Sequence, residues 1–134
     1  MSHLREKSKF NLASAQLLID NDYFAPSVHC SYYGCFQFIK YKLDNIGHTF
    51  KMMDEEITAS NNTLSSHNYP ITLILNKVKE KSDEFYKRGI KDKIKSLKTL
   101  RELSDYHDLY IDNNKSREAL RISNEVIDLI NKKL

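Results

Sequence analysis

The sequence predicts an all-α fold, an up-and-down bundle of four to five helices that forms a single domain over residues 1–134. Three observations favour this fold. The chain contains only three glycines and two prolines, so little interrupts a helix. Leu, Ile and Lys are abundant, which favours helix over sheet. Apolar residues recur at helical spacing, and no stretch shows a convincing alternation of apolar and polar residues, as a strand would.

The first helix is predicted over residues 4–20. Apolar residues recur near intervals of three, four and seven residues, as in a packed helix, in two sets: Phe10, Ala13 and Leu17, and Leu4, Leu12, Ala15 and Leu18. The Asp-Asn-Asp sequence at 20–22 predicts the end of this helix, because asparagine tolerates the left-handed backbone of a helix exit. The next helix follows so closely that we expect the two to be antiparallel.

The second helix is predicted to begin around residues 23–26, with proline in its first turn, and to end at 45 or 46. Residues 28–39 are apolar nearly all round, which is typical of a central helix, and small residues there allow a neighbouring backbone to come close. We therefore expect Tyr32 and Tyr33 to be buried rings of the core, and His29 to be a buried structural residue.

The rest of the bundle follows from later patterns. Residues 52–57 predict a short turn of helix, and a third helix is predicted over 68–81, where His67 is expected to cap or pack at the start. Asp83 is expected to cap a fourth helix that bends or breaks near Gly89. Ser116 is expected to open the last helix, which is amphipathic.

Composition excludes several classes of protein. No run of about 18 apolar residues exists, so we expect no membrane span. The amino-terminal residues are polar and lack the apolar core of a secretory signal, which favours the cytoplasm. Cys30 and Cys35 lie five residues apart, which suits neither a disulfide on one helix nor a zinc site. No cluster of acidic residues, histidines or cysteines has ion-binding spacing, so no metal and no other cofactor is predicted.

The net charge of +3 is unevenly distributed. Residues 77–101 carry ten basic and four acidic side chains, a balance of +6, whereas the segments before and after it are weakly acidic. Such a run is often only the solvated face of a helix. Alternatively it is a phosphate-attracting patch, in which Lys95 and Lys98 lead towards Arg101. The pattern leaves both interpretations open.

Residues 98–110, Lys-Thr-Leu-Arg-Glu-Leu-Ser-Asp-Tyr-His-Asp-Leu-Tyr, gather side chains that suit a phosphate site near the end of a helix. Arginine presents a fork of donors that fits phosphate oxygens, and histidine moves protons near neutral pH. The candidate catalytic residues are Arg101 and His107, and the candidates for binding phosphate or RNA are Ser104, Asp105, Tyr110, Lys95 and Lys98. The structural alternative is an ordinary ion pair between Arg101 and Asp105, with His107 as a hydrogen-bonded core residue on an apolar stripe.

Three blocks of sequence together resemble a known family. The first joins Leu17-Leu18 and Asn21-Asp-Tyr-Phe24 to Ser31-Tyr-Tyr-Gly-Cys-Phe36, the second is Ser66-His-Asn68, and the third is Leu100-Arg-Glu-Leu-Ser-Asp-Tyr106. In this order they resemble the HEPN superfamily, the helical nucleotide-binding domains of prokaryotes and higher eukaryotes, and particularly its small single-domain prokaryotic proteins. The likeness covers nearly the whole chain.

The resemblance implies a homodimer in which the two motif ends meet in a shared cleft. Active ribonucleases of the family carry an Arg, then four to six residues, then a His, so Arg101 and His107 imply a metal-independent endoribonuclease of toxin or defence type. The alternative is a non-catalytic module that binds a nucleotide, RNA or a nucleotidyltransferase partner protein. Glu102, acidic where the active members carry a different polar residue, and Tyr110, three residues after His107 instead of two, favour this alternative.

A ribonuclease mechanism would use the 2′-hydroxyl of RNA as the nucleophile. His107 would act as the base or acid, and Arg101 would hold the phosphate. On a straight helix the two side chains would lie about 9 Å apart in rise and about 120° apart in angle. One chain would therefore not bring them together, and catalysis requires two chains facing across a symmetry axis.

Overall fold

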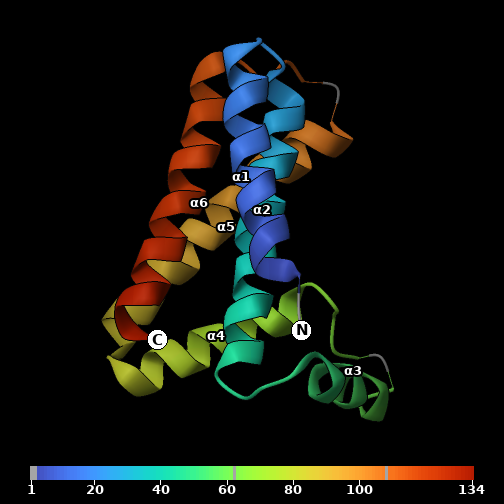
Figure 1. The fold of residues 1–134 in the computed structure, drawn as a ribbon, viewed down its shortest axis with the longest axis vertical. Coiled ribbons are helices and arrows are strands. Elements are labelled where there is room, and N and C mark those ends of the chain that lie inside the picture. The colour runs from blue at the N-terminus through green and yellow to red at the C-terminus, as the bar shows by residue number, and fades with distance from the viewer. Residues whose placement is uncertain (1–2, 62, 108) are drawn as a thin grey trace.

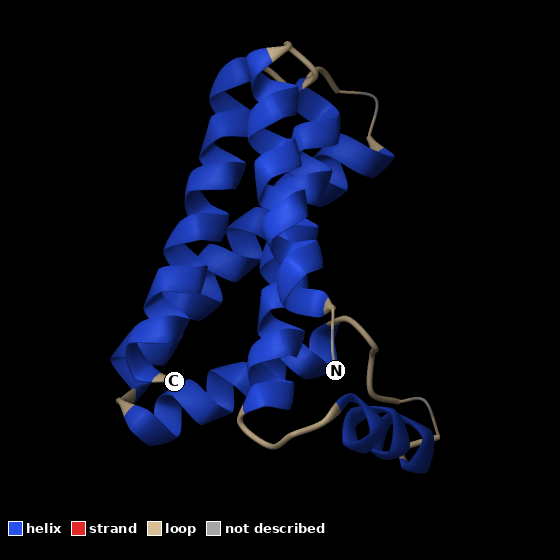
Figure 2. Cartoon of the chain, in the orientation of Figure 1, coloured by secondary structure: helices blue, strands red, loops and turns tan. Residues whose placement is uncertain are grey.

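A computed structural model describes residues 3–61, 63–107 and 109–134, and these form six helices and no strand (Figures 1 and 2). The helices are α1 (Leu4–Asp20), α2 (Phe24–Asn45), α3 (Phe50–Ala59), α4 (Asn68–Lys81), α5 (Glu84–Tyr106) and α6 (Asn113–Lys133). The all-α prediction is confirmed. The count exceeds the predicted four to five, because the segment expected to form a short turn is a ten-residue helix, capped by Thr49, whose hydroxyl accepts from the backbone N–H of Met52 at 3.2 Å.

The helices differ in their direction. α1, α2 and α6 run along the long axis of the molecule, α5 crosses behind them, and α4 lies across their lower end (Figure 1). α3 stands apart at the lower right, and Met53 is its one buried residue. No helix among the described residues is long and apolar enough to cross a membrane.

The core is built around α2, as its apolar middle predicts. Val28, Tyr32 and Ile39 are almost fully buried there, and α5 and α6 supply further apolar side chains to the same core. The small residue Gly34 lets α1 come close, because a methyl group at this position would lie 2.8 Å from the Leu12 side chain. The Ser8 hydroxyl donates to the Gly34 carbonyl at 2.6 Å across the same contact.

The predicted helix ends are partly confirmed. α1 and α4 span their predicted ranges, and the Asp83 carboxylate caps α5 by accepting from the backbone N–H of Tyr86 at 2.7 Å. Of the predicted bend or break at Gly89, the break is wrong, since α5 continues through this residue as one helix. The predicted start of the last helix at Ser116 is also wrong. Asp112 caps α6 instead, and Ser116 lies buried in its first turn.

Of the two apolar sets predicted on α1, the one that contains Ala15 packs against the core and the one that contains Phe10 does not. Phe10, Ala13 and Leu17 are exposed, and α1 packs on α2 through Ser8, Ala15 and Ile19 on its other side. Apolar residues on both sides of a helix leave the choice of the packed side to the shape of its neighbour. Here the close approach at Gly34 decides it.

Candidate functional site

Aromatic and ionisable side chains from three separate parts of the chain meet around Arg101. They come from the first half of α2, from the start of α4 and from the last turns of α5. We call this group the Arg101 cluster, and its members are His29, Tyr32, Tyr33, His67, Arg101, Asp105 and Tyr106. The three blocks of sequence that carry the family resemblance each contribute to it.

Arg101 is held between aromatic rings. Its side chain is largely buried, with 8% of the residue exposed, and its guanidinium carbon lies 4.7 Å from the centre of the Tyr32 ring and 5.6 Å from that of Tyr106. Burial by itself lowers the pKa of Arg101, but contact with Tyr106 and the nearby Tyr32 and Tyr33 hydroxyls outweigh it, and the pKa is raised. The arginine therefore remains charged at every physiological pH.

One nitrogen of Arg101 has an unused hydrogen-bonding group. The Nε atom is buried and has no hydrogen-bond partner among the described residues. A buried donor without a partner costs free energy, so it marks a place where a ligand or ordered water would be stabilising. The Nη1 atom lies 3.7 Å from Asp105 Oδ2. This is an ion pair, but the distance is too long for a hydrogen bond.

Asp105 connects the arginine to α2. Its Oδ2 atom lies 2.9 Å from His29 Nδ1 and 3.7 Å from Arg101 Nη1, so one carboxylate oxygen faces two bases. The predicted ion pair between Arg101 and Asp105 is confirmed. The expectation that His29 would be buried is wrong, because half of its side chain is exposed.

His67 packs against α2 at the start of α4. Its ring stacks on Phe36 with centres 4.7 Å apart, and its Nδ1 atom lies 3.5 Å from the Tyr32 hydroxyl. Burial lowers the pKa of His67, and the positive charges of Arg101, Lys98 and Lys40 lower it further. The imidazole is therefore neutral near pH 7. Burial also raises the pKa of Tyr32 to about 12.

Of the other predicted site residues, Ser104 and Lys98 lie beside the Arg101 cluster, and Lys95 lines a separate cavity. Ser104 donates to the Ala25 carbonyl at 2.8 Å, which ties α5 to the start of α2. Lys98 donates to Asn68 Oδ1 at 2.8 Å, close to His67, whereas Lys95 lines a separate shallow cavity with Thr99, Leu100 and Glu118.

His107 and Tyr110 lie apart from the cluster. α5 ends at Tyr106, and His107 follows as its extended C-cap residue with an exposed side chain. Tyr110 is 79% exposed. Among the described residues, no hydrogen bond, ion pair or ring contact joins either side chain to Arg101. The alternative that His107 is a core residue on an apolar stripe is wrong, because the helix ends one residue before it.

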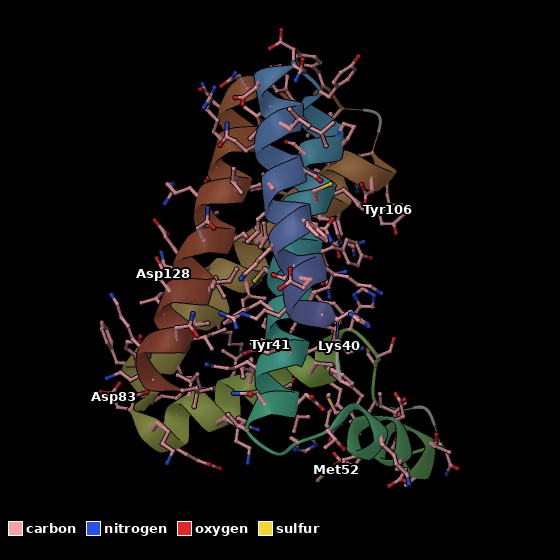
Figure 3. The ribbon with its side chains drawn as sticks, in the orientation of Figure 1. Lys40, Tyr41, Met52, Asp83, Tyr106 and Asp128 are labelled. Carbon is pink, nitrogen blue, oxygen red and sulfur yellow. The ribbon has the colours of Figure 1, made fainter. Side chains whose placement is uncertain are left out.

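The interpretation of Tyr32, Tyr33 and His29 as purely structural residues missed their part in the cluster. Tyr32 is buried as predicted, but the guanidinium of Arg101 lies over its ring, and the Tyr106 ring also contacts that guanidinium. Figure 3 labels Tyr106 near the end of α5. The places of Tyr32 and Tyr33 in the first block are the sequence signal that would have grouped them with Arg101, and His29, which lies outside the three blocks, has no such signal.

A groove adjoins the cluster on the side of α2. It has a volume of about 380 Å³ and a mostly apolar wall, and its lining residues are Ala25, Pro26, His29, Cys30, Ser104 and Asp105. Cys30 is half-buried and Cys35 is buried, and both are free thiols, as predicted from their spacing.

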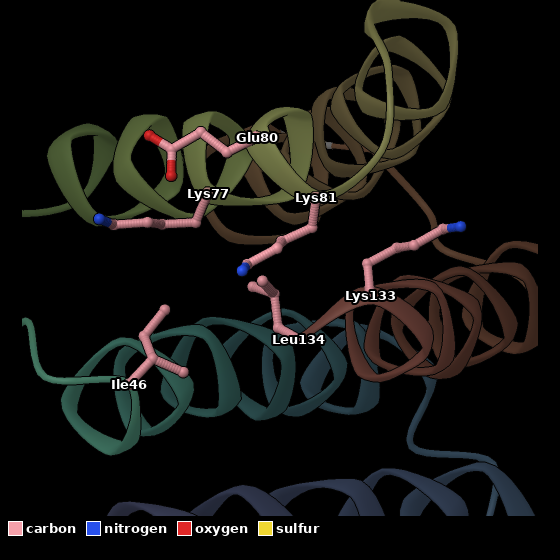
Figure 4. A pocket seen from close by; sticks show the side chains of 6 residues that line it. All are labelled: Ile46, Lys77, Glu80, Lys81, Lys133 and Leu134. Carbon is pink, nitrogen blue, oxygen red and sulfur yellow. The ribbon is translucent and has the colours of Figure 1, made fainter.

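A second cavity, of about 530 Å³, lies at the opposite end of the bundle (Figure 4). It is lined by Ile46, Lys77, Glu80, Lys81, Lys133 and Leu134. α2, α4 and α6 all end beside it, so its lysines offset the partial negative charge of three helix carboxyl ends. We interpret it as structural. No group of three or more His, Cys, Asp or Glu in the described ranges is arranged to hold a metal ion.

Comparison of the chain with family models, with curated proteins and with solved structures found no match. The HEPN resemblance therefore stays a prediction from the three blocks of sequence.

Proposed function

We propose that this chain is a HEPN-like, non-catalytic module that binds a phosphate-bearing ligand, a nucleotide or RNA, at the Arg101 cluster. One observation carries the proposal. The three blocks that resemble the family, far apart in sequence, converge on one charged and largely buried arginine that has an unpartnered Nε donor. A guanidinium is suited to phosphate because it is permanently charged and presents several donors in a fixed plane.

The surroundings of Arg101 favour an anionic ligand with a flat group. Lys98 and Lys40 add positive charge near His67, and Asp105 is the one acidic side chain in ion-pair contact with Arg101 among the described residues. Tyr106 is 72% exposed although it touches the guanidinium, which leaves much of its ring accessible to a base. Stacking on an exposed aromatic ring is a common way in which proteins hold single-stranded RNA.

The experiment measures binding of a fluorescent single-stranded RNA oligonucleotide and, separately, of ATP at low and moderate salt. Arg101→Met should lower affinity at least about tenfold, since it removes a charged donor at the ligand. The matched control is Arg88→Met, which removes an exposed charge from the same helix outside the cluster. Arg101→Lys keeps the charge without the fork and should fall between.

Equal losses in Arg88→Met and Arg101→Met would mean that binding follows net charge, and the proposed site would be wrong. No binding by the unaltered chain would also reject the proposal. Thermal unfolding of each variant establishes that the Arg101 substitutions leave the fold intact. A nucleotidyltransferase partner protein is the third proposed ligand of the Arg101 cluster. Its test is co-purification with the unaltered chain and loss of that complex in Arg101→Met.

A ribonuclease is the second candidate, and the exposure of His107 favours it. Its imidazole is accessible immediately after α5, where it would be free to act as base or acid on RNA held by a second chain. In such a homodimer, Arg101 would steady the phosphate while the 2′-hydroxyl attacks phosphorus and the 5′-oxygen leaves. Tyr106 would have to move, because it covers Arg101.

Incubation of RNA with the unaltered chain, Arg101→Ala and His107→Ala, in the presence of a chelator, separates the two candidates. Cleavage by the unaltered chain alone supports the ribonuclease. If all three proteins fail to cut while the unaltered chain and His107→Ala still bind RNA, the module is supported and the ribonuclease is rejected.

A further inference from the structure

α5 and α2 lie beside each other at the Arg101 cluster and run in opposite directions. Ser104 of α5 donates to the Ala25 carbonyl near the start of α2, whereas Arg101, three residues earlier, lies over the ring of Tyr32. Earlier residues of α5 therefore lie beside later residues of α2. The charge changes sign along this contact, because Asp105 lies near Ala25 and positive side chains follow in the other direction.

Lys98 places a second positive charge about one turn of α5 before Arg101. The two residues are three positions apart, so their side chains leave the same side of the helix. The Lys98 amine donates to Asn68 Oδ1 at 2.8 Å, and Asn68 is the residue after His67. Because the asparagine amide is uncharged, this contact leaves the positive charge of Lys98 in place.

Lys40 places a third positive charge further along α2. Its Nζ atom lies 5.9 Å from the centre of the Phe36 ring, and that ring stacks on His67 with centres 4.7 Å apart. Figure 3 labels Lys40 on α2, below Tyr106 in the view. Asp54 of α3 lines a small cavity with Lys40, but no ion pair joins the two among the described residues. The charge of Lys40 is therefore also available to a ligand.

His67 lies among these three positive charges. Burial lowers the pKa of its imidazole, and the charges that lower it further are all positive, those of Arg101, Lys98 and Lys40. Like charges gathered in this way repel one another, and Asp105 lies one turn later on α5, away from Lys98. An anion bound among the three would relieve this repulsion. The buried Nε atom of Arg101, which has no hydrogen-bond partner among the described residues, would give that anion a donor.

We propose that the ligand of the Arg101 cluster carries at least two linked phosphates, which lie along Arg101, Lys98 and Lys40. We call these three residues the phosphate track. The inference rests on the proposed function and names the class of its ligand, either a nucleotide with two or more phosphates or the backbone of RNA. The acidic Glu102 and Asp105 both come after Arg101 on α5, so they disfavour a phosphate there and leave that end to an uncharged part of the ligand.

The test compares ligands that differ in their number of phosphates, by titration calorimetry at low salt. The unaltered chain should bind ATP at least about tenfold more tightly than AMP, because AMP lacks the second phosphate. Lys98→Met and Lys40→Met should each weaken ATP binding about fivefold or more and leave AMP binding nearly unchanged. Lys98→Arg and Lys40→Arg keep the charge and should keep most of the affinity for ATP, which separates the charge from any effect on the fold.

Two other lysines provide matched controls. Lys95→Met removes a charge from α5 at a residue that lines a separate cavity with Glu118. Lys42→Met removes a charge from α2 at a residue on the opposite side of the helix from Lys40, at 100° per residue. Both controls should bind ATP nearly as tightly as the unaltered chain does.

A single-stranded RNA oligonucleotide distinguishes the two sources of linked phosphates. If the RNA backbone occupies the track, RNA binds more tightly than ATP, and the RNA affinity takes over the dependence on Lys98 and Lys40. Each of these lysines replaced by methionine should then reduce the slope of log affinity against log salt concentration by about 0.7. If a nucleotide occupies the track, ATP shows the dependence instead.

Lysine variants that bind both ATP and RNA as tightly as the two controls do would overturn the phosphate track. If Arg101→Met still weakens binding in the same assays, the proposed function stands without the track. If Arg101→Met binds as tightly as the unaltered chain, or if that chain binds neither ligand, the proposed function fails and the track fails with it.

Discussion

His29 Nδ1 lies 2.9 Å from Asp105 Oδ2, so a residue in the second turn of α2 holds the carboxylate that also faces Arg101. The two residues are 76 positions apart in the sequence. Because Asp105 contacts both residues, the strength of its contact with His29 affects how strongly it pairs with Arg101. A ligand phosphate at Arg101 would compete with this carboxylate.

Replacement of His29 by alanine removes one partner of Asp105 but leaves Arg101 in place. Since half of the His29 side chain is exposed, we expect a loss of about 0.5–1 kcal/mol in the free energy of unfolding, measured in urea. His107→Ala is the control, because it removes an exposed imidazole without a side-chain partner in the described residues. An equal effect of both changes would show that the contact between His29 and Asp105 adds nothing to stability.

Asp105→Asn should separate stability from ligand binding. The amide keeps the shape of the carboxylate but removes the negative charge facing Arg101, so we expect a loss of about 1–3 kcal/mol in the free energy of unfolding. Affinity for RNA should rise, because the guanidinium no longer has a competing anion. Fluorescence anisotropy measures that affinity, and a lower affinity in Asp105→Asn would mean that this carboxylate helps to hold the ligand.

The lowered pKa of His67 predicts a pH dependence of stability. The unfolded chain takes up a proton near the ordinary histidine pKa of about 6.5, whereas the folded chain does so only at lower pH. The contribution of neutral His67 to the free energy of unfolding is therefore complete above pH 6.5. It is lost as the pH falls from there through the folded-state pKa.

Urea unfolding at several pH values between 7.5 and 5 tests this dependence by comparing the unaltered chain with His67→Phe. The phenyl ring can keep the stack on Phe36 and does not titrate, so the stability of the variant should decline less steeply below pH 6.5. Contributions from other groups cancel in the difference between the two proteins. Parallel curves would contradict the assigned direction of the pKa.

Two glycines in helices should respond to alanine in opposite ways. At Gly89 a methyl group meets nothing within 4 Å, so Gly89→Ala should raise the free energy of unfolding by about 0.5–1 kcal/mol. At Gly34 the methyl group would lie 2.8 and 2.9 Å from two atoms of Leu12, so α1 or this side chain must shift. We expect Gly34→Ala to cost about 1–3 kcal/mol through overpacking. Thermal and urea unfolding of both variants would compare the two directly, and stabilisation by both would show that Leu12 moves aside freely.

Local chemistry made much of the fold predictable. The cap at Asp83 and the apolar middle of α2 are short-range signals, and both are present in the structure. The errors arose where context decides. Glycine can adopt the helical conformation, and α5 continues through Gly89 without a break. Asp112 is as good a cap as Ser116 and comes first in the chain.

The candidate site was less predictable, because its contacts are long-range. Arg101 and Asp105 were recognised from their spacing within one helix, as an ion pair one turn apart. Neither the 76-residue contact of His29 with Asp105 nor the packing of Tyr32 beneath Arg101 has a local signature. The sequence around Tyr106 also has no local signal for the end of α5 there. Because the helix ends at Tyr106, the side chain of His107 is exposed to solvent.

The separate position of α3 has a practical consequence for work on this protein. Since the segment buries only Met53 and stands away from the helices that build the Arg101 cluster, its carboxyl end near Ser60 is a suitable place to insert a fluorescent or affinity label. A label there would report binding at the arginine without occupying the Arg101 cluster.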